Sequence, residues 1–538
     1  MMPRNLLAAL TSAALLVHPV AARAQGAVPA PAPAAKGAPA AAAPAATPAP
    51  AAPAPAADAS APVPAAEKDA QKEEEEAAPA APEKVDPKLF DEALSEYFGG
   101  NPRDAARSLF TWLSAAPRTD DNYAWAQYFL ARSLIDLGLT HAGATYLARI
   151  ARERSNPNVM PLALEQLKRL TDKPHDEVMI DEQVFGALDL GFLEEEAGRY
   201  AHYQQGLVDL RVGNERWANT HFAKLEEGSA EASRAKFALL VTRLRTVKEP
   251  SEELIKDFLA LSEDTKLARE ARNEAALAVA RLRYERQDYP GALDGYSRVK
   301  LPELDPGRAT LYLEEAWTRY KLGELRASLG ILTTLDAPSF RDEFLPDKYL
   351  LRALIYRDLC HYLPAKRAAK ELTRRFADSL EAIAAREDLT QDLRLRRAAA
   401  ARGSTKRAAG FKELLELESE RLGRFSGSFG ERLTGHLTKL YALSLGEAER
   451  VYQTRLAEAV RQEADTLLRA AEQVRLMEYE VGLKLYERVK KGSKLVEPAQ
   501  ETLLRPDQVG FPFDGEYWND ELKSYRVNIS SRCLEDSP

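Results

Sequence analysis

Cysteine is scarce in this 538-residue chain, which has only Cys360 and Cys533. Two cysteines exclude a disulfide-rich scaffold and any zinc or iron–sulfur site built from several cysteines. The seven histidines are scattered and no His-Glu-x-x-His pair occurs, so the sequence predicts no metal site and no cofactor. We interpret Cys360 as a small buried residue in a helix turn, and a disulfide with Cys533 is the alternative.

An excess of positive charge is also lacking. The chain has 74 Lys and Arg against 82 Asp and Glu, a net charge of −8, which argues against a nucleic-acid partner. No phosphate-binding loop is present. Ser428 lies in a sequence that resembles a nucleophile elbow but has no predicted strand before it. We therefore predict no catalytic residue and no enzymatic activity. The 45% hydrophobic content is enough to bury a large core.

Residues 1–24 have the pattern of a secretory signal peptide. Arg4 supplies the positive start, Leu6 to Val17 is a short apolar run, and Ala22-Arg23-Ala24 is a cleavage site of small residues. An uncleaved N-terminal anchor is the alternative. A lipoprotein needs a cysteine directly after the cleavage point, and the first cysteine here is Cys360, which argues against a lipoprotein. No later run is apolar enough to span a membrane, so we expect a periplasmic or secreted protein.

Residues 25–84 form a low-complexity segment. Between Ala27 and Ala66, 33 of 40 residues are Ala or Pro, and eleven of these are Pro. Proline at that density stops helices and sheets and favours polyproline II conformations. We expect a disordered linker that tethers a folded body, with a mere solubilising spacer as the alternative.

From residue 85 to 380 one spacing recurs in a chain that is helical by pattern. A turn residue is followed five positions later by a small residue that opens a second amphipathic helix. The six pairs are Gly100 and Ala105, Gly138 and Gly143, Gly213 and Ala218, Gln287 and Ala292, Gly323 and Ser328, and Cys360 and Ala365. Another small residue lies seven positions before each turn. Small residues at these positions allow two antiparallel helices to pack closely.

This pattern resembles the tetratricopeptide (TPR) repeat, and the best matches are residues 100–117, 203–225 and 312–338. Two of the intervals between successive turn residues are near 75 residues, about twice the others. We therefore expect further degenerate pairs around 178–199 and 232–261, and about eight pairs in all. The resemblance implies an all-α solenoid whose groove binds a peptide or another protein. Aromatic residues are candidates for the groove wall or, alternatively, for the core between helices: Tyr123, Trp125, Tyr128, Tyr200, Tyr203, Trp217, Tyr312 and Trp317. His202 and His221 lie on successive predicted helices and could approach each other.

Residues 381–410 are predicted to form a basic hinge. Between positions 386 and 407, seven basic residues, Arg394, Arg396 and Arg397 among them, stand against three acids. This excess suggests contact with cell-wall polymer, a membrane surface or an acidic partner. A solvated helix end is the alternative interpretation.

Residues 411–495 are predicted to form long amphipathic helices. A helix from Phe411 to Gly423 is followed by a Gly- and Ser-rich break at 426–430, and no breaker occurs from Glu447 to Lys491. A helix of that length needs a partner for its apolar stripe. We favour a hairpin with the arm 411–445, and a coiled-coil homodimer through residues 447–491 is the alternative.

Residues 496–538 form an aromatic tail. Tyr517 and Trp518 lie among acids, residues 514–515 indicate a turn, and 525–529 has the pattern of a short strand. The tail is similar to those of TPR proteins of bacterial gliding-motility envelope complexes. It is either a docking peptide, with Tyr517 and Trp518 in contact with a partner, or a clamp on the C-terminal helices.

These features together predict an exported, non-enzymatic scaffold that binds envelope proteins through its solenoid groove, in a gliding-motility or surface-assembly machine. Two alternatives stay open. One is a protein that binds cell wall or polysaccharide through the basic hinge, and the other is an enzyme whose site lies within residues 381–538.

Overall fold

The computed structural model describes residues 87–154, 156–171, 173–186, 190, 192–193, 195–246, 251–491 and 515–533. All regular elements in these ranges are helices, so the predicted all-α fold is confirmed. The predicted signal peptide and linker lie outside the described residues, as does part of the tail. Within the described ranges, no helix combines the length and apolarity that a membrane span requires.

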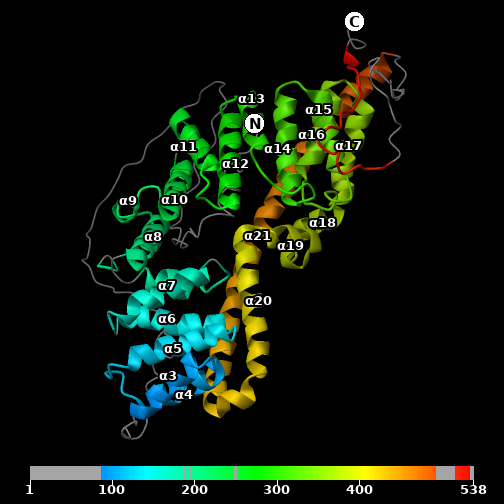
Figure 1. Ribbon diagram of the computed structural model, residues 1–538. Coiled ribbons are helices and arrows are strands. Elements are labelled where there is room, and N and C mark those ends of the chain that lie inside the picture. The colour runs from blue at the N-terminus through cyan, green and yellow to red at the C-terminus, as the bar shows by residue number, and fades with distance from the viewer. Residues whose placement is uncertain are drawn as a thin grey trace, which may run out of the picture.

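The first part of the fold is a solenoid of paired helices (Figure 1). Seven pairs are α-helical: α3 (Pro87–Phe98) with α4 (Pro102–Ala115), α5 (Tyr123–Asp136) with α6 (Thr140–Glu153), α8 (Glu195–Arg211) with α9 (Glu215–Phe222), α10 (Ala230–Thr246) with α11 (Glu252–Glu263), α12 (Arg269–Glu285) with α13 (Tyr289–Ser297), α14 (Gly307–Lys321) with α15 (Leu325–Thr334), and α16 (Asp347–Asp358) with α17 (Tyr362–Arg375). Between the second and third of them, α7 (Val159–Thr171) is followed by a π-helical turn, η1 (Val178–Val184). This partly corrects the prediction of a pair around 178–199, whereas α10 and α11 match the pair predicted around 232–261.

The predicted turn residues all adopt the left-handed conformation. The φ angles of Gly100, Gly138, Gly213, Gln287, Gly323 and Cys360 lie between 59° and 83°. This conformation ends the first helix of each pair and suits glycine best, because other residues pay about 1–2 kcal/mol for it. The small residues that follow are buried as the spacing predicted. At Gly206, on the preceding helix of its pair, a Cβ atom would come within 2.3 Å of the Phe222 ring, so the close helix approach there requires glycine.

After the solenoid, the described residues form five further helical elements. They are α18 (Ala377–Ala385), the 3-10 turn η2 (Leu389–Gln391), α19 (Leu393–Ala400), α20 (Gly403–Gly423) and α21 (Ser426–Lys490). The predicted basic hinge is therefore mostly helical. The first long arm occupies 403–423 instead of 411–445, because the chain reverses at 424–430 and not near residue 446. The predicted break is confirmed at Gly430, whose φ of 74° and ψ of 167° are not helical.

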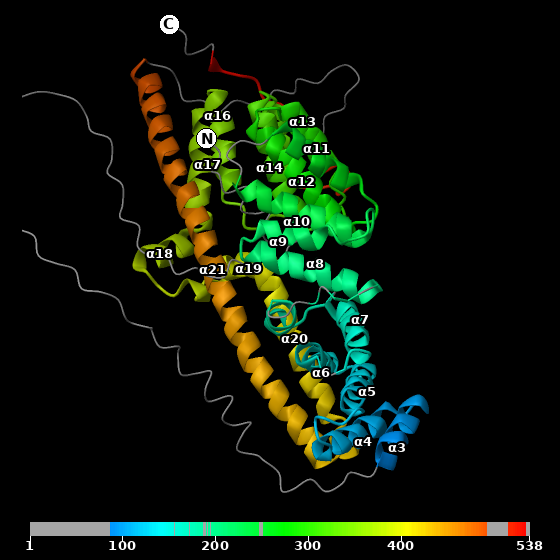
Figure 2. The same ribbon diagram turned by 90° about the vertical axis from the view of Figure 1, so that its left-hand side faces the viewer.

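Helices α20 and α21 run back along the solenoid, and we call residues 403–490 the brace. Figures 1 and 2 show α21 as a rod that passes from α4 at one end of the arc to α16 and α17 at the other. Leu433 and Leu437 pack into the core of the first repeats, whereas Val460 and Leu467 pack against the last repeats. From 431 to 490 the helix is about 90 Å long at 1.5 Å per residue. Its predicted apolar stripe is thus covered by the chain's own repeats as well as by α20.

Candidate functional site: the cleft between the brace and the last repeats

The brace is fixed to the first repeats by a buried carboxylate. Oε1 of Glu418, on α20, accepts a hydrogen bond of 2.8 Å from the backbone N–H of Thr140, and Oε2 accepts one of 2.9 Å from that of His141. Thr140 Oγ1 and the Tyr441 hydroxyl also donate to this carboxylate. These N–H groups begin α6, whose N-cap residue Leu139 has no capping side chain. A carboxylate 278 residues away in the chain therefore caps this helix.

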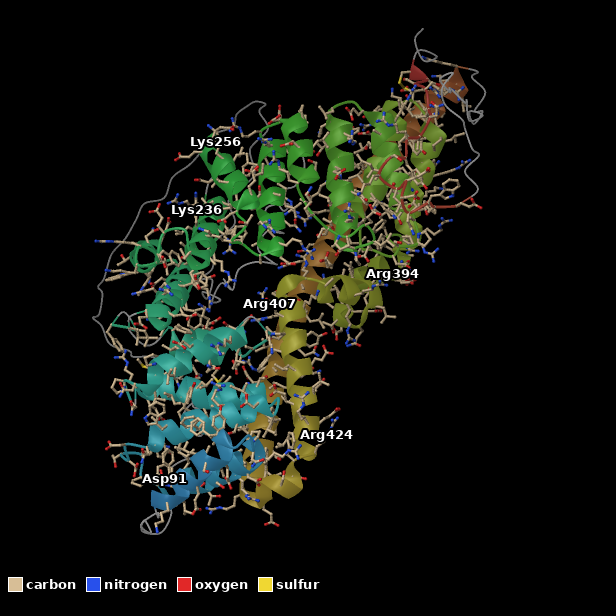
Figure 3. All side chains as sticks on the ribbon, in the orientation of Figure 1. Asp91, Lys236, Lys256, Arg394, Arg407 and Arg424 are labelled. Atoms are coloured by element: carbon tan, nitrogen blue, oxygen red, sulfur yellow. A yellow bond between two sulfur atoms is a disulfide. The ribbon has the colours of Figure 1, made fainter. Side chains whose placement is uncertain are left out.

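A second anchor lies at the middle of the brace. Glu177, just before η1, accepts ion-pair contacts from Arg407 Nε at 3.3 Å and from Arg455 Nη2 at 2.6 Å. The two arginines come from α20 and α21, so one carboxylate holds both arms of the hairpin. Figure 3 shows Arg407 near the start of α20.

The third anchor holds the last repeats and is mainly apolar. Val474, Met477 and Val481 of α21 are buried in the core cluster that includes α16 and α17. At its edge, Arg357 Nη1 lies 3.0 Å from Glu480 Oε2, and the Arg488 guanidinium lies over the Tyr362 ring at 4.5 Å. The brace thereby contacts both ends of the solenoid.

Between the second and third anchors, an open cleft of about 1410 Å³ lies between the brace and the solenoid. Its walls come from α14, the loop 342–347, α16, α19 and α21, and we call it the brace cleft. Apolar side chains make up much of the lining, among them Trp317, Phe344, Leu350, Phe376 and Met477. The volume exceeds the range of about 300–1,000 Å³ that is typical of small-molecule sites. A segment of a protein or polymer fits this space better than a metabolite does.

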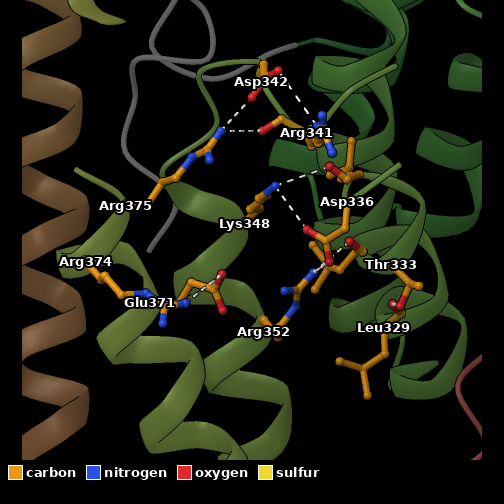
Figure 4. Close-up of polar contacts among 12 residues, drawn as sticks. Leu329, Thr333, Asp336, Arg341, Asp342, Lys348, Arg352, Glu371, Arg374 and Arg375 are labelled. Atoms are coloured by element: carbon orange, nitrogen blue, oxygen red, sulfur yellow. Dashed lines mark hydrogen bonds and ion pairs between the residues drawn. The ribbon is translucent and has the colours of Figure 1, made fainter. Parts of the chain in front are cut away.

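The loop wall of the cleft is held in place by cations from α16 and α17 (Figure 4). Asp336, in the turn after α15, contacts Lys348 Nζ at 3.2 Å and Arg352 Nη2 at 2.5 Å. Arg375 binds Asp342 Oδ1 at 2.8 Å and the carbonyl of Arg341 at 3.2 Å. Burial lowers the pKa of Lys348 despite the Asp336 carboxylate beside it. The wall is therefore fixed before any ligand binds.

The charge balance of the cleft is tilted toward positive. Arg394 and Arg397 line it from α19 and have no ion pair within the described ranges. The pKa values of Asp347 and Glu343 are raised, mainly by burial, while Arg469 and Arg397 respectively act in the opposite direction. Two arginines that form no ion pair with a described residue, beside two carboxyls that bind protons more readily than usual, favour an acidic ligand. Figure 3 shows Arg394 where α19 meets the last repeats.

The C-terminal tail crosses α15 and the turn between α16 and α17. The backbone N–H of Val527 donates to the Arg326 carbonyl at 3.2 Å, and Arg326 Nε donates to the Ile529 carbonyl at 2.9 Å. Leu522 is buried in the core of these repeats. The described residues 515–533 contain no strand, since the tail pairs with helix termini and side chains instead of another strand. The tail therefore clamps the last repeats and not the long C-terminal helices.

The two cysteines form a disulfide, Cys360–Cys533, at a sequence separation of 173. This corrects our preferred interpretation of Cys360 as an unpaired turn residue. The positive φ of Cys360 and the docked tail bring the two side chains together, and His361 Nε2 adds a 2.7 Å contact with the Ser530 carbonyl. Such long-range docking has no signal in local sequence.

Four of the aromatic residues predicted for the groove wall or the core are wholly or partly buried. Tyr128 and Tyr312 are buried in the core, and Tyr312 packs edge-on against Phe340. Tyr123 and Tyr203 are half-buried against core clusters. Trp317 lines the brace cleft, whereas Trp217 is 62% exposed outside that lining.

The other predicted contact residues divide between the cleft and the tail. Arg394 and Arg397 line the brace cleft, whereas Arg396 is exposed outside its lining. Tyr517 is half-buried against the core of the last repeats, and Trp518 is about half exposed. Phe344, Phe376 and Met477 line the cleft without any prior prediction, since their pattern is that of ordinary amphipathic helices and a loop.

The predicted approach of His202 and His221 is confirmed, with 3.0 Å between their Nδ1 atoms. Across the described ranges, no group of three or more His, Cys, Asp or Glu side chains is arranged to hold a metal ion. No model of a known protein family matches this sequence, and a search of curated proteins finds no significant match.

Proposed function

We propose that this protein is an exported, non-enzymatic scaffold that holds an acidic segment of an envelope protein in the brace cleft. The observation that carries the proposal is the cleft itself, which combines an apolar lining with Arg394 and Arg397 on a preformed frame. The signal-like residues 1–24 and a disulfide, which favours an oxidising compartment, support export. The TPR-like spacing supports a role in protein–protein contact.

The cleft differs from the groove expected of a TPR superhelix. In that expectation the curved face of the repeats alone would bind the partner. Here α19 and α21 supply one side of the space and the last repeats supply the other. A ligand would therefore contact both parts and reinforce their association.

The test compares charge reversals on one helix. Arg394→Glu together with Arg397→Glu places negative charge in the cleft, and Arg396→Glu is the matched control because it is exposed on the same helix outside the lining. After cross-linking in native envelopes, defined proteins should copurify with the wild type and the control and be lost with the double variant. An identical set of proteins from all three, or none from the wild type, would reject the proposal.

Cell-wall or polysaccharide binding is the second candidate, since the same two arginines lie beside aromatic residues. Arg394 lies 6.0 Å from the centre of the Phe376 ring. Sedimentation with purified wall material separates the candidates. Binding that the double variant loses and Arg396→Glu keeps would favour the polymer, whereas no sedimentation of the wild type would remove it.

The narrower role in a gliding-motility or surface-assembly machine remains a prediction from the tail. Deletion of the gene should then abolish movement or surface export and leave general envelope integrity intact. A deletion strain that moves and exports normally would remove this role without affecting the scaffold proposal.

A further inference from the structure

The last turns of α21 are apolar on two opposite faces. One face, with Val481 and Leu485, is buried against the last repeats. The opposite face presents a stripe of four side chains that are 47–69% exposed: Leu476, Tyr479, Leu483 and Tyr486. A helix that is apolar on two opposite faces gains stability when a second partner covers the face that is still exposed. We call these four residues the distal stripe.

The distal stripe has the spacing of a coiled-coil seam. Its members are three, four and three residues apart, which places them at alternating a and d positions of a heptad. The next positions of the same seam are Glu472 on one side and Lys490 on the other. We propose that this stripe pairs antiparallel with the same stripe of a second copy, so that the protein is a two-fold symmetric dimer.

Antiparallel pairing matches the sizes of the side chains. Leu476 then faces Tyr486 of the second copy, and Tyr479 faces Leu483. Each layer contains one leucine and one tyrosine, so the helices remain evenly separated along the seam. Parallel pairing would alternate wide Tyr–Tyr layers with narrow Leu–Leu layers, and knobs would fit holes poorly.

Charges at the ends of the seam also match. In the antiparallel register Glu472 faces Lys490 of the second copy at both ends, whereas parallel pairing would oppose like charges. Neither residue has an ion pair within the described ranges. Near the two-fold axis, Glu480 meets its own copy, but Arg357 lies 3.0 Å away and offsets its charge. Flanking the seam, Glu487 is paired with Lys484 at 3.0 Å.

Contacts within a single copy do not explain why position 482 is a glycine. It lies in the helix interior, and a Cβ atom there would meet nothing within 4 Å. Glycine in a helix interior costs about 1 kcal/mol relative to alanine. In the proposed dimer it lies one residue from the midpoint of the seam, where a small residue lets the two helices approach closely.

The area is sufficient for a dimer of moderate affinity. Two tyrosines and two leucines at these exposures offer on the order of 500–600 Å² per copy. Two copies would bury about 1,000–1,200 Å², at the lower end of the range for specific interfaces. The seam predicted earlier through residues 447–491 is thereby restricted to its distal part, on the face opposite the buried one.

Sedimentation equilibrium of the purified chain tests this inference. The wild type should have the mass of a dimer at tens of micromolar. Leu483→Glu should raise the dissociation constant at least about 100-fold. Leu443→Glu is the matched control, because Leu443 is 77% exposed on the same helix far from the stripe and its change should leave the mass unaltered. Equal ellipticity at 222 nm would show that all variants are folded. A monomeric wild type, or equal effects of the two substitutions, would overturn the dimer.

A charge swap tests the direction of pairing. Glu472→Lys and Lys490→Glu should each raise the dissociation constant by about 5-fold, and the two together should restore it. Failure of the double variant to recover would reject the antiparallel arrangement. Leu476 of the distal stripe also lines the edge of the brace cleft, but the substituted residues Leu483, Glu472 and Lys490 lie outside that lining. These variants therefore change the dimer without changing a cleft residue, and partner capture by each of them is measured separately.

Discussion

Single side chains hold the brace to the solenoid, and Glu418 is the clearest case. Its carboxylate receives two backbone N–H groups at the start of α6 and two hydroxyls, so its burial is fully compensated. Nothing in the residues around Glu418 distinguishes it from the other glutamates of α20. The role depends on a helix that lies far away in sequence.

Replacement of Glu418 by glutamine should lower the free energy of unfolding by about 2–3 kcal/mol. The amide keeps the size of the side chain but loses the charge at the helix start and leaves its NH₂ group facing backbone donors. Chemical denaturation at pH 7 measures the change. Glu420→Gln, on the exposed face of the same helix, should shift stability by less than about 0.5 kcal/mol. Equal effects would contradict the capping role.

His141 should make the protein less stable in mild acid. Burial lowers its pKa to about 4, against an ordinary value of 6.5, although the nearby Glu418 acts in the opposite direction. The unfolded chain therefore binds a proton at pH values where the folded chain does not. Stability should fall by about 3 kcal/mol between pH 7 and pH 4 through this residue.

Denaturation midpoints of wild type and His141→Gln across that range provide the measurement. The difference between the two curves should be constant above pH 7 and should shrink or reverse as the pH falls, because glutamine does not titrate. His436 has a lowered pKa as well and titrates in both proteins, so it cancels in the comparison. Parallel curves would show that His141 is not buried in the neutral form.

At the scale of elements, the fit between the tail and α15 depends on the absence of one methyl group. A Cβ atom on Gly330 would lie 1.8 Å from the backbone oxygen of Tyr525, so the tail crosses this helix where only glycine fits. Gly435 of α21, in contrast, has open space around the position of its Cβ atom. Both glycines lie within helices, but only Gly330 is required by a close contact.

Gly330→Ala should displace the tail even though alanine favours the helix. Limited proteolysis should then cleave within residues 515–533 much faster than in the wild type, and thermal stability should fall. Gly435→Ala should instead stabilise the protein by up to about 1 kcal/mol, since nothing opposes the gain in helix propensity. Stabilisation by both substitutions would show that the tail does not depend on this contact.

At the scale of the whole molecule, the brace joins repeats that a simple solenoid would leave independent. In a linear array each repeat contacts only its neighbours, and local loss of structure stays local. Here α21 packs into the first and the last repeats (Figure 2). We therefore expect the two ends to unfold together.

Leu467→Ala tests this coupling. Leu467 is fully buried at the junction of α21 with the last repeats, and its truncation should cost about 2–5 kcal/mol. Hydrogen exchange should accelerate in α4 as well as in α16 and α17. Leu443→Ala, on an exposed position of the same helix, should change neither region. Acceleration confined to the last repeats would indicate that the brace transmits no stability along the molecule.

Local chemistry in the sequence determined the paired helices and their turns. Gly100 and its five equivalents take the left-handed conformation because a helix pair needs a tight reversal, and the buried small residues follow from close packing; both are properties of a few adjacent residues. Only the tertiary structure decided which faces the long helices cover, where the cleft forms and which cysteine meets which. Those outcomes depend on contacts between residues as distant as Thr140 and Glu418, and no local pattern of charge or apolarity specifies such a pairing.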